Sequence, residues 1–191
     1  MTIRIVPATA DRWADFEGLF GPSGACYGCW CTYWRQSHAE RAKATAAGSK
    51  ALIKKRFAQH RAPGLLAYEG ETCVGWVQVT PRAEVPRFNA ARAASHPLEQ
   101  DEAVDPDVWA ITCFFFRAGH RGRGLSHPMV AAAAAFARGH GARLLDACPM
   151  RLAKKSGSVG LYVGSEQVFV KAGFSEAARR IPNRPLMRLA L

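Results

Sequence analysis

The hexapeptide RGRGLS at residues 121–126 combines glycine and arginine at a spacing that suits the binding of an anion. Its two glycines let the backbone turn tightly, so that successive N–H groups point into one concavity. The hexapeptide lies between an extended apolar run and an alanine-rich run typical of a helix, whose N-terminal end adds positive potential. We therefore predict a phosphate-binding loop, with His127 in the first helical turn beside it.

A second distinctive stretch, CYGCWCTYWR at residues 26–35, concentrates thiols and aromatic rings near the N-terminus. Three interpretations are open: the wall of a substrate pocket, a zinc site with His38 as a fourth ligand, and ordinary core packing. Structural zinc sites usually draw their ligands from two separated pairs, which disfavours the second interpretation. We favour the pocket wall, for which the candidate residues are Tyr27, Cys29, Trp30, Cys31, Trp34 and, on a later strand, Trp76.

The bulk composition is that of an ordinary globular chain, with 191 residues of which 49% are hydrophobic and 21% charged. A net charge of +11 attracts anions, but no basic stripe or aromatic-basic repeat suggests a nucleic-acid partner. The six cysteines come without a signal-peptide pattern, and no apolar run approaches the ~18 residues of a membrane span. We therefore expect a cytoplasmic chain with free thiols and no membrane partner.

Hydrophobic periodicity predicts the elements that must position these residues. The central one is a strand at residues 108–116 that is apolar on both faces and leads directly into the glycine-rich loop. Residues 82–106, rich in proline and acidic residues, are expected to form a long irregular connection. The other expected strands are 2–6, 65–68, 73–80, 143–148, 174–180 and 185–190, and the expected helices are about 9–20, 49–60, 126–140 and 165–172.

The order of these elements resembles the GNAT superfamily of acetyl-CoA-dependent N-acetyltransferases. The matching order is this strand, the glycine-rich loop, the helix, a strand and a short helix that ends in Ala172-Gly173-Phe174. The family signature falls on Arg121, Gly124 and Ser126, where serine departs mildly from the usual glycine or alanine. The resemblance implies one α/β domain over residues 1–191, with a mixed, mostly antiparallel central sheet flanked by helices. It also implies acetyl-CoA as the acyl donor.

In closer detail the chain is similar to a bacterial subgroup of that superfamily that carries a Cys-x-x-Cys-Trp-Cys segment near the N-terminus. The matching pieces are residues 26–31, Gly75-Trp76, residues 113–115 (CFF) and residues 184–188 (RPLMR). No settled acceptor comes with this subgroup, so the resemblance names a reaction and leaves the acceptor open.

The resemblance also assigns the residues expected to hold the cofactor. In the superfamily the strand before the loop runs beside the pantetheine arm, and a backbone N–H there binds the oxyanion formed when an amine attacks the acetyl carbonyl. Two of the three phenylalanine side chains of this strand are expected to be core. The expected cofactor-binding residues are Phe114, Phe115, Phe116, Arg121, Gly122, Arg123, Gly124, Leu125, Ser126 and His127.

The usual general acid of the family is missing from its usual position. Many members place a tyrosine four residues before the Gly-Phe pair to protonate the leaving thiolate, and this chain has Phe169 there. Tyr162 is the substitute candidate. Asp146 is a candidate general base, with Asp107, Glu84 and a relayed water as alternatives.

These features predict an enzyme that moves an acetyl group directly onto a primary amine of a small-molecule or peptide acceptor. Transfer of a longer acyl group is a variant of the same prediction. The alternative from another class is a catalytically weak module that senses acyl-CoA or thiol state, which the phenylalanine at position 169 favours. A homodimer is compatible with the sequence. The favoured interpretation involves no metal ion.

Overall fold

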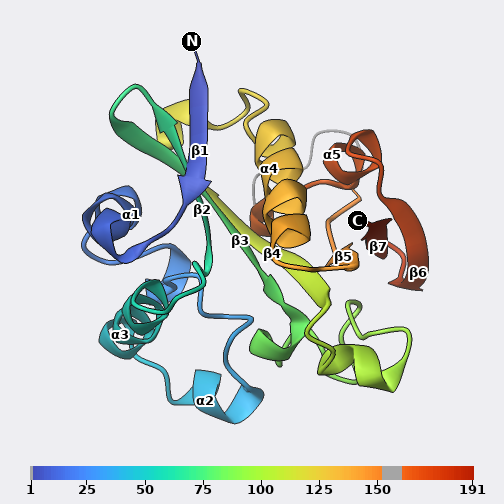
Figure 1. Ribbon diagram of the computed structural model, residues 1–191. Helices are drawn as coiled ribbons and strands as arrows, with labels where there is room; N and C mark the ends of the chain where they lie inside the picture. Colours follow the sequence, from blue (N-terminus) through green and yellow to red (C-terminus); the bar gives the residue numbers. More distant parts are fainter. Residues whose placement is uncertain (1, 152–160) are drawn as a thin grey trace.

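The computed structural model describes residues 2–151 and 161–191 of the chain. Its centre is a seven-stranded sheet with the order β1-β2-β3-β4-β5-β7-β6 (Figure 1). Neighbouring strands are antiparallel except β4 and β5, which are parallel. The strands are β1 Ile3–Pro7, β2 Gly64–Glu69, β3 Thr72–Pro81, β4 Val108–Phe116, β5 Leu144–Ala147, β6 Ser175–Ile181 and β7 Arg184–Ala190.

Helices cover both faces of this sheet (Figure 1). Helices α4 and α5 pack on one face through side chains such as Met129 and Phe169, whereas α1 and α3 pack on the other through Phe16 and Ile53. Each face therefore has its own hydrophobic core. The helices are α1 Trp13–Phe20, α2 His38–Ala42, α3 Ala46–Phe57, α4 Ser126–Gly139 and α5 Glu166–Lys171.

The predicted fold class and the order of elements are confirmed, and the differences are local. Helix α3 begins at Ala46, earlier than the predicted Ser49, because the side chain of Thr45 accepts a hydrogen bond from the Gly48 N–H at 3.0 Å and caps the helix there. Helix α2 was not predicted. Its start is a capping box, in which the Ser37 hydroxyl accepts from the Glu40 N–H and the Glu40 carboxylate accepts from the Ser37 N–H.

The predicted irregular connection 82–106 contains only short 3₁₀ turns, at Arg82–Glu84 and Gln100–Ala103. The buried Arg82 holds it in place, since its Nε donates to Asn89 Oδ1 at 3.0 Å and its Nη2 donates to the Ser95 carbonyl at 2.6 Å. The connection is thus ordered by side-chain hydrogen bonds instead of regular secondary structure.

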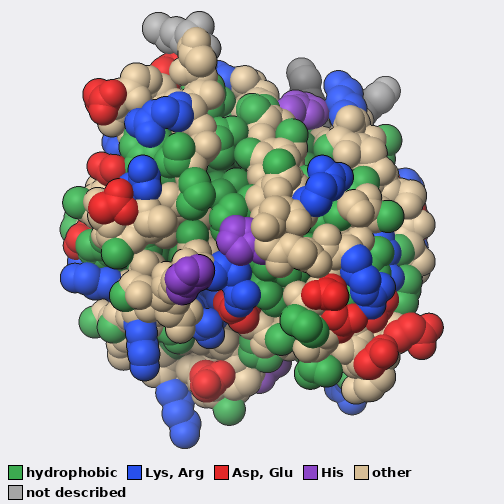
Figure 2. All heavy atoms as spheres, in the orientation of Figure 1, with side chains coloured by type: hydrophobic (Ala, Val, Ile, Leu, Met, Phe, Trp, Pro, Cys, Tyr) green, Lys and Arg blue, Asp and Glu red, His purple; other side chains and the backbone are tan. Residues whose placement is uncertain are grey.

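The surface carries charges of both signs. Figure 2 shows basic and acidic side chains interspersed over one face of the molecule, without a continuous basic stripe on that face. Within the described ranges, no helix is long and apolar enough to cross a lipid bilayer.

Candidate active site

The sheet opens at the centre of the molecule, where β4 and β5 separate. Their pairing covers only Val108–Ile111 of β4 against Leu144–Ala147 of β5. Strand β5 ends at Ala147, whereas β4 continues to Phe116. Among the described residues, 112–116 of β4 therefore have no neighbouring strand on this side. A strand edge without a neighbour presents N–H and C=O groups to a ligand.

A β-bulge lies at the point where the two strands separate. Gln78 of β3 pairs with Cys113, but the next residue, Val79, pairs with Ile111, so Thr112 has no partner across the ladder. A bulge bends its strand and increases the local twist. The bulge at Thr112 therefore accounts for the divergence of β4 from β5.

The orientation of the β4 backbone follows from one hydrogen bond at its end. The Arg117 N–H donates to the Val74 carbonyl of β3 at 3.0 Å, which turns the backbone polar groups of Arg117 towards β3. Because these groups alternate along a strand, those of Phe114 and Phe116 point to the opposite, open edge. The Arg121 Nε donates to the Phe116 carbonyl at 3.1 Å from that side.

The glycine-rich loop follows β4 and leads into α4, which begins at Ser126. Gly122 and Gly124 have φ angles of 73° and 76°, the left-handed conformation that glycine adopts without strain. None of the N–H groups of residues 122–126 donates to a protein acceptor in the part of the chain that the structure describes. These free donors at the start of a 14-residue helix fit a pyrophosphate group.

A charged cluster ties this loop to the β2–β3 hairpin. Glu69 accepts from His120 Nε2 at 2.9 Å and from Arg123 Nη2 at 3.1 Å. The His120 hydrogen bond, followed by that of Arg123, lowers the pKa of Glu69 against a smaller opposing effect of burial. Arg123 is therefore committed to Glu69 in this structure, so its side chain is less available to a phosphate than the backbone donors are.

Residues 26–162 match the family model described as Acetyltransferase (GNAT) family. The chain belongs to the GNAT acetyltransferase family. Acetyl-CoA is the acyl donor typical of this family, and the open β4 edge with the donor-rich loop fits such a ligand in this GNAT chain. No curated protein matches the sequence significantly.

Solved structures share the GNAT fold at low sequence identity. The GNAT domain of S. lividans PAT matches with a TM-score of 0.59 and 18% identity, covering 100% of this chain and 92% of that one. PaiA N-acetyltransferase from Thermoplasma acidophilum, in complex with coenzyme A, matches at 0.56 with 11% identity and 100% coverage of both chains. YncA from Salmonella typhimurium, with its cofactor acetyl-CoA, matches at 0.55 with 13% identity, covering 100% and 95%.

The phenylalanines of β4 divide between core and opening in this GNAT chain. The Phe114 side chain is buried against Phe169, and the Phe115 ring stacks on Phe20 with centroids 4.4 Å apart. Phe116 is only partly buried. The side chains are thus mainly packing groups, and the predicted contact with the cofactor rests on the backbone of this strand.

Phe169 leaves no hydroxyl at the usual GNAT acid position. Its ring is fully buried between Phe114 and Phe174, with centroid distances of 6.2 Å and 5.1 Å. Gly164 packs so closely here that a Cβ would lie 2.9 Å from Phe169 Cε2. The predicted substitute, Tyr162, lies in a 3₁₀ turn, Leu161–Val163, that contacts β4.

The Tyr162 hydroxyl retains its proton in this environment. Its side chain is partly exposed, and burial raises its pKa above the ordinary value. Nearby Tyr33 adds to the rise, Arg184 opposes it, and Cys113 and Cys29 make smaller contributions in the raising direction. Tyr162 stays protonated at neutral pH and belongs to a turn that contacts β4, so it is a candidate proton donor at the open edge.

Asp146, the predicted base, has a different environment from the one that the sequence suggested. Its carboxylate is fully buried, forms an ion pair with the buried Arg82, and accepts from Arg188 at 2.7 Å and 3.0 Å. Arg188 also pairs with Glu102 at 2.7 Å. Because all its oxygens are engaged by guanidinium groups, we assign Asp146 a structural role in place of the predicted catalytic one.

The two alternative bases are also poorly placed. Glu84 is bound by Arg35, Arg56 and Arg61. Burial raises its pKa, but the charge and hydrogen bond of Arg35 and the further donors outweigh this and lower it to about 2. Asp107 precedes β4, at the end where β4 and β5 are still paired, and so lies away from the opening. A relayed water is the remaining expected acceptor for the amine proton.

The predicted pocket wall proves to be mostly core. Trp30 and Trp76 are buried in an aromatic cluster with Phe16 and Phe57, and Tyr27 points outwards with 97% of its surface exposed. Aromatic side chains in an irregular segment bury large apolar surfaces as readily as they line a pocket, which explains the correction. Burial therefore argues against Trp30 and Trp76 as substrate contacts, whereas the contact predicted for Tyr27 stays a prediction.

The thiols of the same segment meet β4. The Sγ atoms of Cys31 and Cys113 are 2.8 Å apart and both residues are buried. Burial, followed by the contact with Cys113, raises the pKa of Cys31 well above its ordinary value, and burial also raises that of the half-buried Cys29. Within the described residues no group of three His, Cys, Asp or Glu side chains is arranged to hold a metal ion.

One predicted residue, Trp34, does line a cavity, of about 260 Å³. Its partners Arg87 and Arg92 come from the irregular connection and Arg184 from the start of β7, and the sequence analysis assigned none of these three arginines to the substrate. The signal for Arg87 and Arg92 was their place in a long connection, where binding residues tend to lie, and Arg184 is the first residue of the RPLMR piece at residues 184–188.

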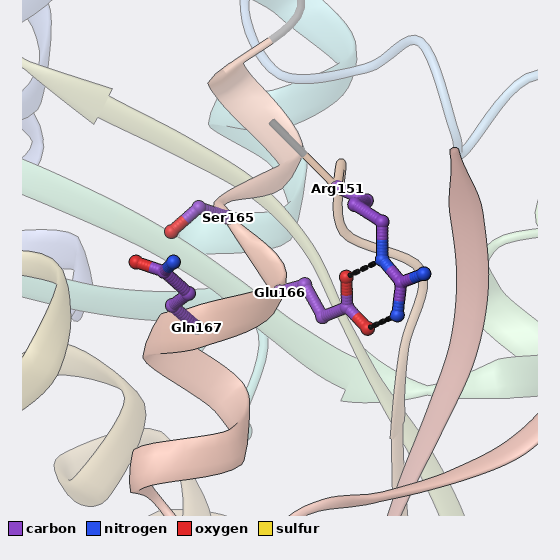
Figure 3. Close-up of a pocket in the computed structure, with 4 residues that line it drawn as sticks. All are labelled: Arg151, Ser165, Glu166 and Gln167. Atoms are coloured by element: carbon purple, nitrogen blue, oxygen red, sulfur yellow. Dashed lines mark hydrogen bonds and ion pairs between the residues drawn. The ribbon is translucent and has the colours of Figure 1, made fainter. Parts of the chain in front are cut away.

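A smaller cavity of about 160 Å³ lies at the start of α5 (Figure 3). Arg151 donates to both oxygens of Glu166 at 2.7 Å and 2.8 Å, while Ser165 and Gln167 point away from this pair. Glu166 also pairs with Arg179 of β6. These charges satisfy one another and fix α5 against the sheet edge, so the described residues give this cavity no free charged group to attract a ligand.

Proposed function

We propose that this GNAT chain is an N-acetyltransferase that moves the acetyl group of acetyl-CoA directly to a primary amine. The observation that carries the proposal is the open edge of β4 at residues 112–116, directly before a loop with free N–H donors. The two features are continuous along the chain, so a ligand with a phosphate group and an extended arm can contact both at once.

In this proposal the loop holds the pyrophosphate and the β4 edge holds the extended arm with its thioester. The N–H groups of Gly122 to Ser126 donate to phosphate oxygens, and Arg121 adds positive charge beside them. His127, in the first turn of α4, is a further proposed contact. Leu125 is nearly buried and anchors the loop to the core beneath α4.

The transfer itself needs an oxyanion donor and a proton balance. The amine nitrogen forms a bond to the acetyl carbonyl carbon, the carbonyl oxygen becomes negative, and the C–S bond then breaks to release a thiolate. The N–H groups of Phe114 and Phe116 point to the open edge, and one such donor contributes about 3–4 kcal/mol. Tyr162 supplies the proton to the thiolate, and water takes the proton lost by the amine.

A second candidate function is an acyl-CoA-binding module that responds to thiol oxidation. Two observations favour it: Phe169 offers no proton at the usual acid position, and the Cys31–Cys113 pair lies on β4 beside the opening. In this alternative the chain binds the acyl donor without transferring its acyl group.

Turnover measurements distinguish the two functions. Purified protein is incubated with acetyl-CoA and a broad panel of primary amines, and free thiol release and acetylated product are both measured, with amine-free reactions as the control. The enzyme proposal predicts amine-dependent thiol release matched by equal product. Binding of acetyl-CoA without turnover of any amine, together with altered binding after oxidation, would support the module instead.

A further inference from the structure

The cavity beside Trp34 is lined by cationic and aromatic groups. Its functional lining consists of Tyr33, Trp34, His38, Arg87, Arg92 and Arg184, and its other lining residues are small or apolar: four alanines or serines and one isoleucine. In the described part of the chain, no aspartate or glutamate contributes to the wall. A recess with several cations and no acid has a positive potential that favours an anionic ligand.

Arg87 is held in place without a carboxylate. Its guanidinium lies over the Tyr33 ring at 4.5 Å from the centroid, and its Nη1 donates to the Tyr33 hydroxyl at 3.3 Å. The same nitrogen is 3.5 Å from His38 Nε2, and the Arg87 N–H donates to the Trp34 carbonyl at 3.3 Å. The planar fork of an arginine fixed in this way is ready to bind a carboxylate or phosphate.

Two further donors in the wall have no partner. The Arg184 Nη2 donates to the Cys148 carbonyl at 2.9 Å, but its Nε is buried without a partner among the described residues. The indole Nε1 of Trp34 is likewise buried and unpartnered there. Buried donors normally have acceptors, so both point to an acceptor group supplied by a ligand or by water.

The cavity arginines differ from the other recessed arginines of this chain. Arg35, Arg82 and Arg188 each pair with a carboxylate of the protein. Arg87 and Arg184 bond only to neutral groups of the described chain, namely carbonyls, a hydroxyl and an imidazole. The three arginines Arg35, Arg82 and Arg188 thus have a counter-charge within the protein, whereas Arg87 and Arg184 have none among the described residues.

The cavity adjoins the opening between β4 and β5. Arg184 bonds to Cys148, the residue that follows β5 directly. Arg184 begins β7, the strand that pairs with β5, and the 3₁₀ turn that carries Tyr162 contacts β4. A group bound in the cavity therefore lies near the end of β5, where β5 separates from β4.

We infer that this cavity binds an anionic group of the acceptor, so that the acceptor carries both a primary amine and a carboxylate or phosphate. This inference rests on the proposed function, which it deepens by naming the class of acceptor. The amine lies at the open β4 edge, while the anion bonds to Arg87, Arg184 and the Trp34 indole. Neutral amines and polyamines lack the group that these donors need.

A matched acceptor series tests the inference. The compounds are ω-amino carboxylates of increasing chain length, their carboxamides, the ω-aminoalkyl phosphates and the corresponding diamines. Charge-assisted hydrogen bonds of about 1.5–3 kcal/mol correspond to a kcat/KM that is about tenfold to a hundredfold higher for the anionic members. A comparison of the carboxylate compounds with the phosphate compounds shows which anion the cavity binds better. Carboxamides or diamines that react as fast as the anionic compounds would overturn the inference.

Variants locate the effect in the cavity. Arg87→Gln and Arg184→Gln should raise the KM for the anionic acceptor about tenfold or more while the KM for acetyl-CoA stays unchanged. Arg92→Gln, at an exposed position of the rim, provides a variant with little risk to folding. Arg138→Gln on the exposed face of α4 is the matched control and should change neither constant. An equal KM in all four variants would contradict the inference.

A binding measurement separates this inference from the proposed function, since it needs no turnover. Protein saturated with coenzyme A, which occupies the glycine-rich loop, is titrated with succinate or inorganic phosphate, and the indole N–H resonances are followed by NMR. The Trp34 signal, identified with Trp34→Phe, should shift in wild type and not in Arg87→Gln. If the signal shifts but no amine is acetylated, the anion-binding cavity stands, while the proposed function fails and with it the assignment of the anion to an acceptor. If neutral amines are acetylated and the signal does not move, only the inference fails.

Discussion

The Sγ atoms of Cys31 and Cys113 lie 2.8 Å apart, which joins the N-terminal aromatic segment to β4 directly after the bulge at Thr112. Both thiols are buried, and Cys31 has a φ of 53°, which is uncommon for a residue other than glycine. Burial raises the pKa of Cys31 well above its ordinary value, so this thiol stays protonated and is a poor nucleophile at neutral pH. The contact therefore packs the N-terminal segment against β4 beside the opening, and Cys31 is disfavoured as a nucleophile.

This contact predicts which cysteines become linked on oxidation. Diamide takes two hydrogens from two thiols and is reduced to the hydrazine, leaving a disulfide. We expect Cys31 and Cys113 to be the linked pair, formed slowly because both thiols are buried and the pKa of Cys31 is raised. Peptide mapping by mass spectrometry identifies the link. Cys73, which is buried but has no thiol partner among the described residues, should stay unlinked, and a link from exposed Cys26 as the main product would argue against this geometry.

Replacing the buried Asp146 should lower the free energy of unfolding strongly. Asp146→Asn leaves the buried guanidinium of Arg82 without its counter-charge, and breaking a buried pair in this way costs about 3–5 kcal/mol. Urea unfolding at neutral pH measures the loss. Asp105→Asn, which removes an exposed pair with Arg143, is the control and should cost far less. Equal losses of unfolding free energy in the two variants would show that the buried ion pair stabilises the fold no more than the exposed one does.

Glu84 makes the stability depend on pH in a defined direction. Its pKa falls from an ordinary 4.5 to about 2 in the folded chain, so the folded state keeps the carboxylate ionised where the unfolded state protonates it. The stabilisation is fully present above pH 4.5 and is lost as the pH falls towards 2. The difference in unfolding free energy between wild type and Glu84→Gln should therefore shrink over this range. A difference that stays constant with pH would assign the effect to packing alone.

The role proposed for Tyr162 makes a kinetic prediction. Tyr162→Phe removes the proton donor without changing its shape, and a positioned acid or base typically contributes about 10²- to 10⁴-fold to the rate. We expect kcat to fall by that factor while the KM for acetyl-CoA changes little, as measured by initial rates of thiol release. Tyr27→Phe, at a fully exposed position, should match wild type. A kcat within twofold of wild type in Tyr162→Phe would remove this residue from the mechanism.

The parts of the fold that depend on local pattern were predictable from the sequence. The run at residues 108–116, apolar on both faces, coincides with β4. Gly122 and Gly124, the glycines from which the loop was predicted, adopt the left-handed conformation. The hydrophobic faces of α1 and α4 follow the helical period and pack as expected. The resemblance to the Cys-x-x-Cys-Trp-Cys subgroup stays a prediction.

The parts that depend on distant residues were not predictable. Asp146 looks like a free acid at a strand end, and only the fold brings Arg82 and Arg188 to it. Trp30 and Trp76 cannot be assigned to a pocket or a core until their neighbours are known. Arg87 and Arg184 likewise meet only because β7 returns beside the irregular connection.

The central claim is that residues 122–126 and the β4 edge bind acetyl-CoA, and calorimetric titration with acetyl-CoA tests it most directly. Gly124→Val strains a left-handed backbone position in the loop, whereas Gly141→Val strains a similar exposed position, with a φ of 85°, beyond the far end of α4. Wild type and Gly141→Val should bind acetyl-CoA with similar affinity. Gly124→Val should bind about a hundredfold more weakly, since at least two charge-assisted hydrogen bonds of about 1.5–3 kcal/mol each are lost. Equal affinity in all three proteins would contradict the account.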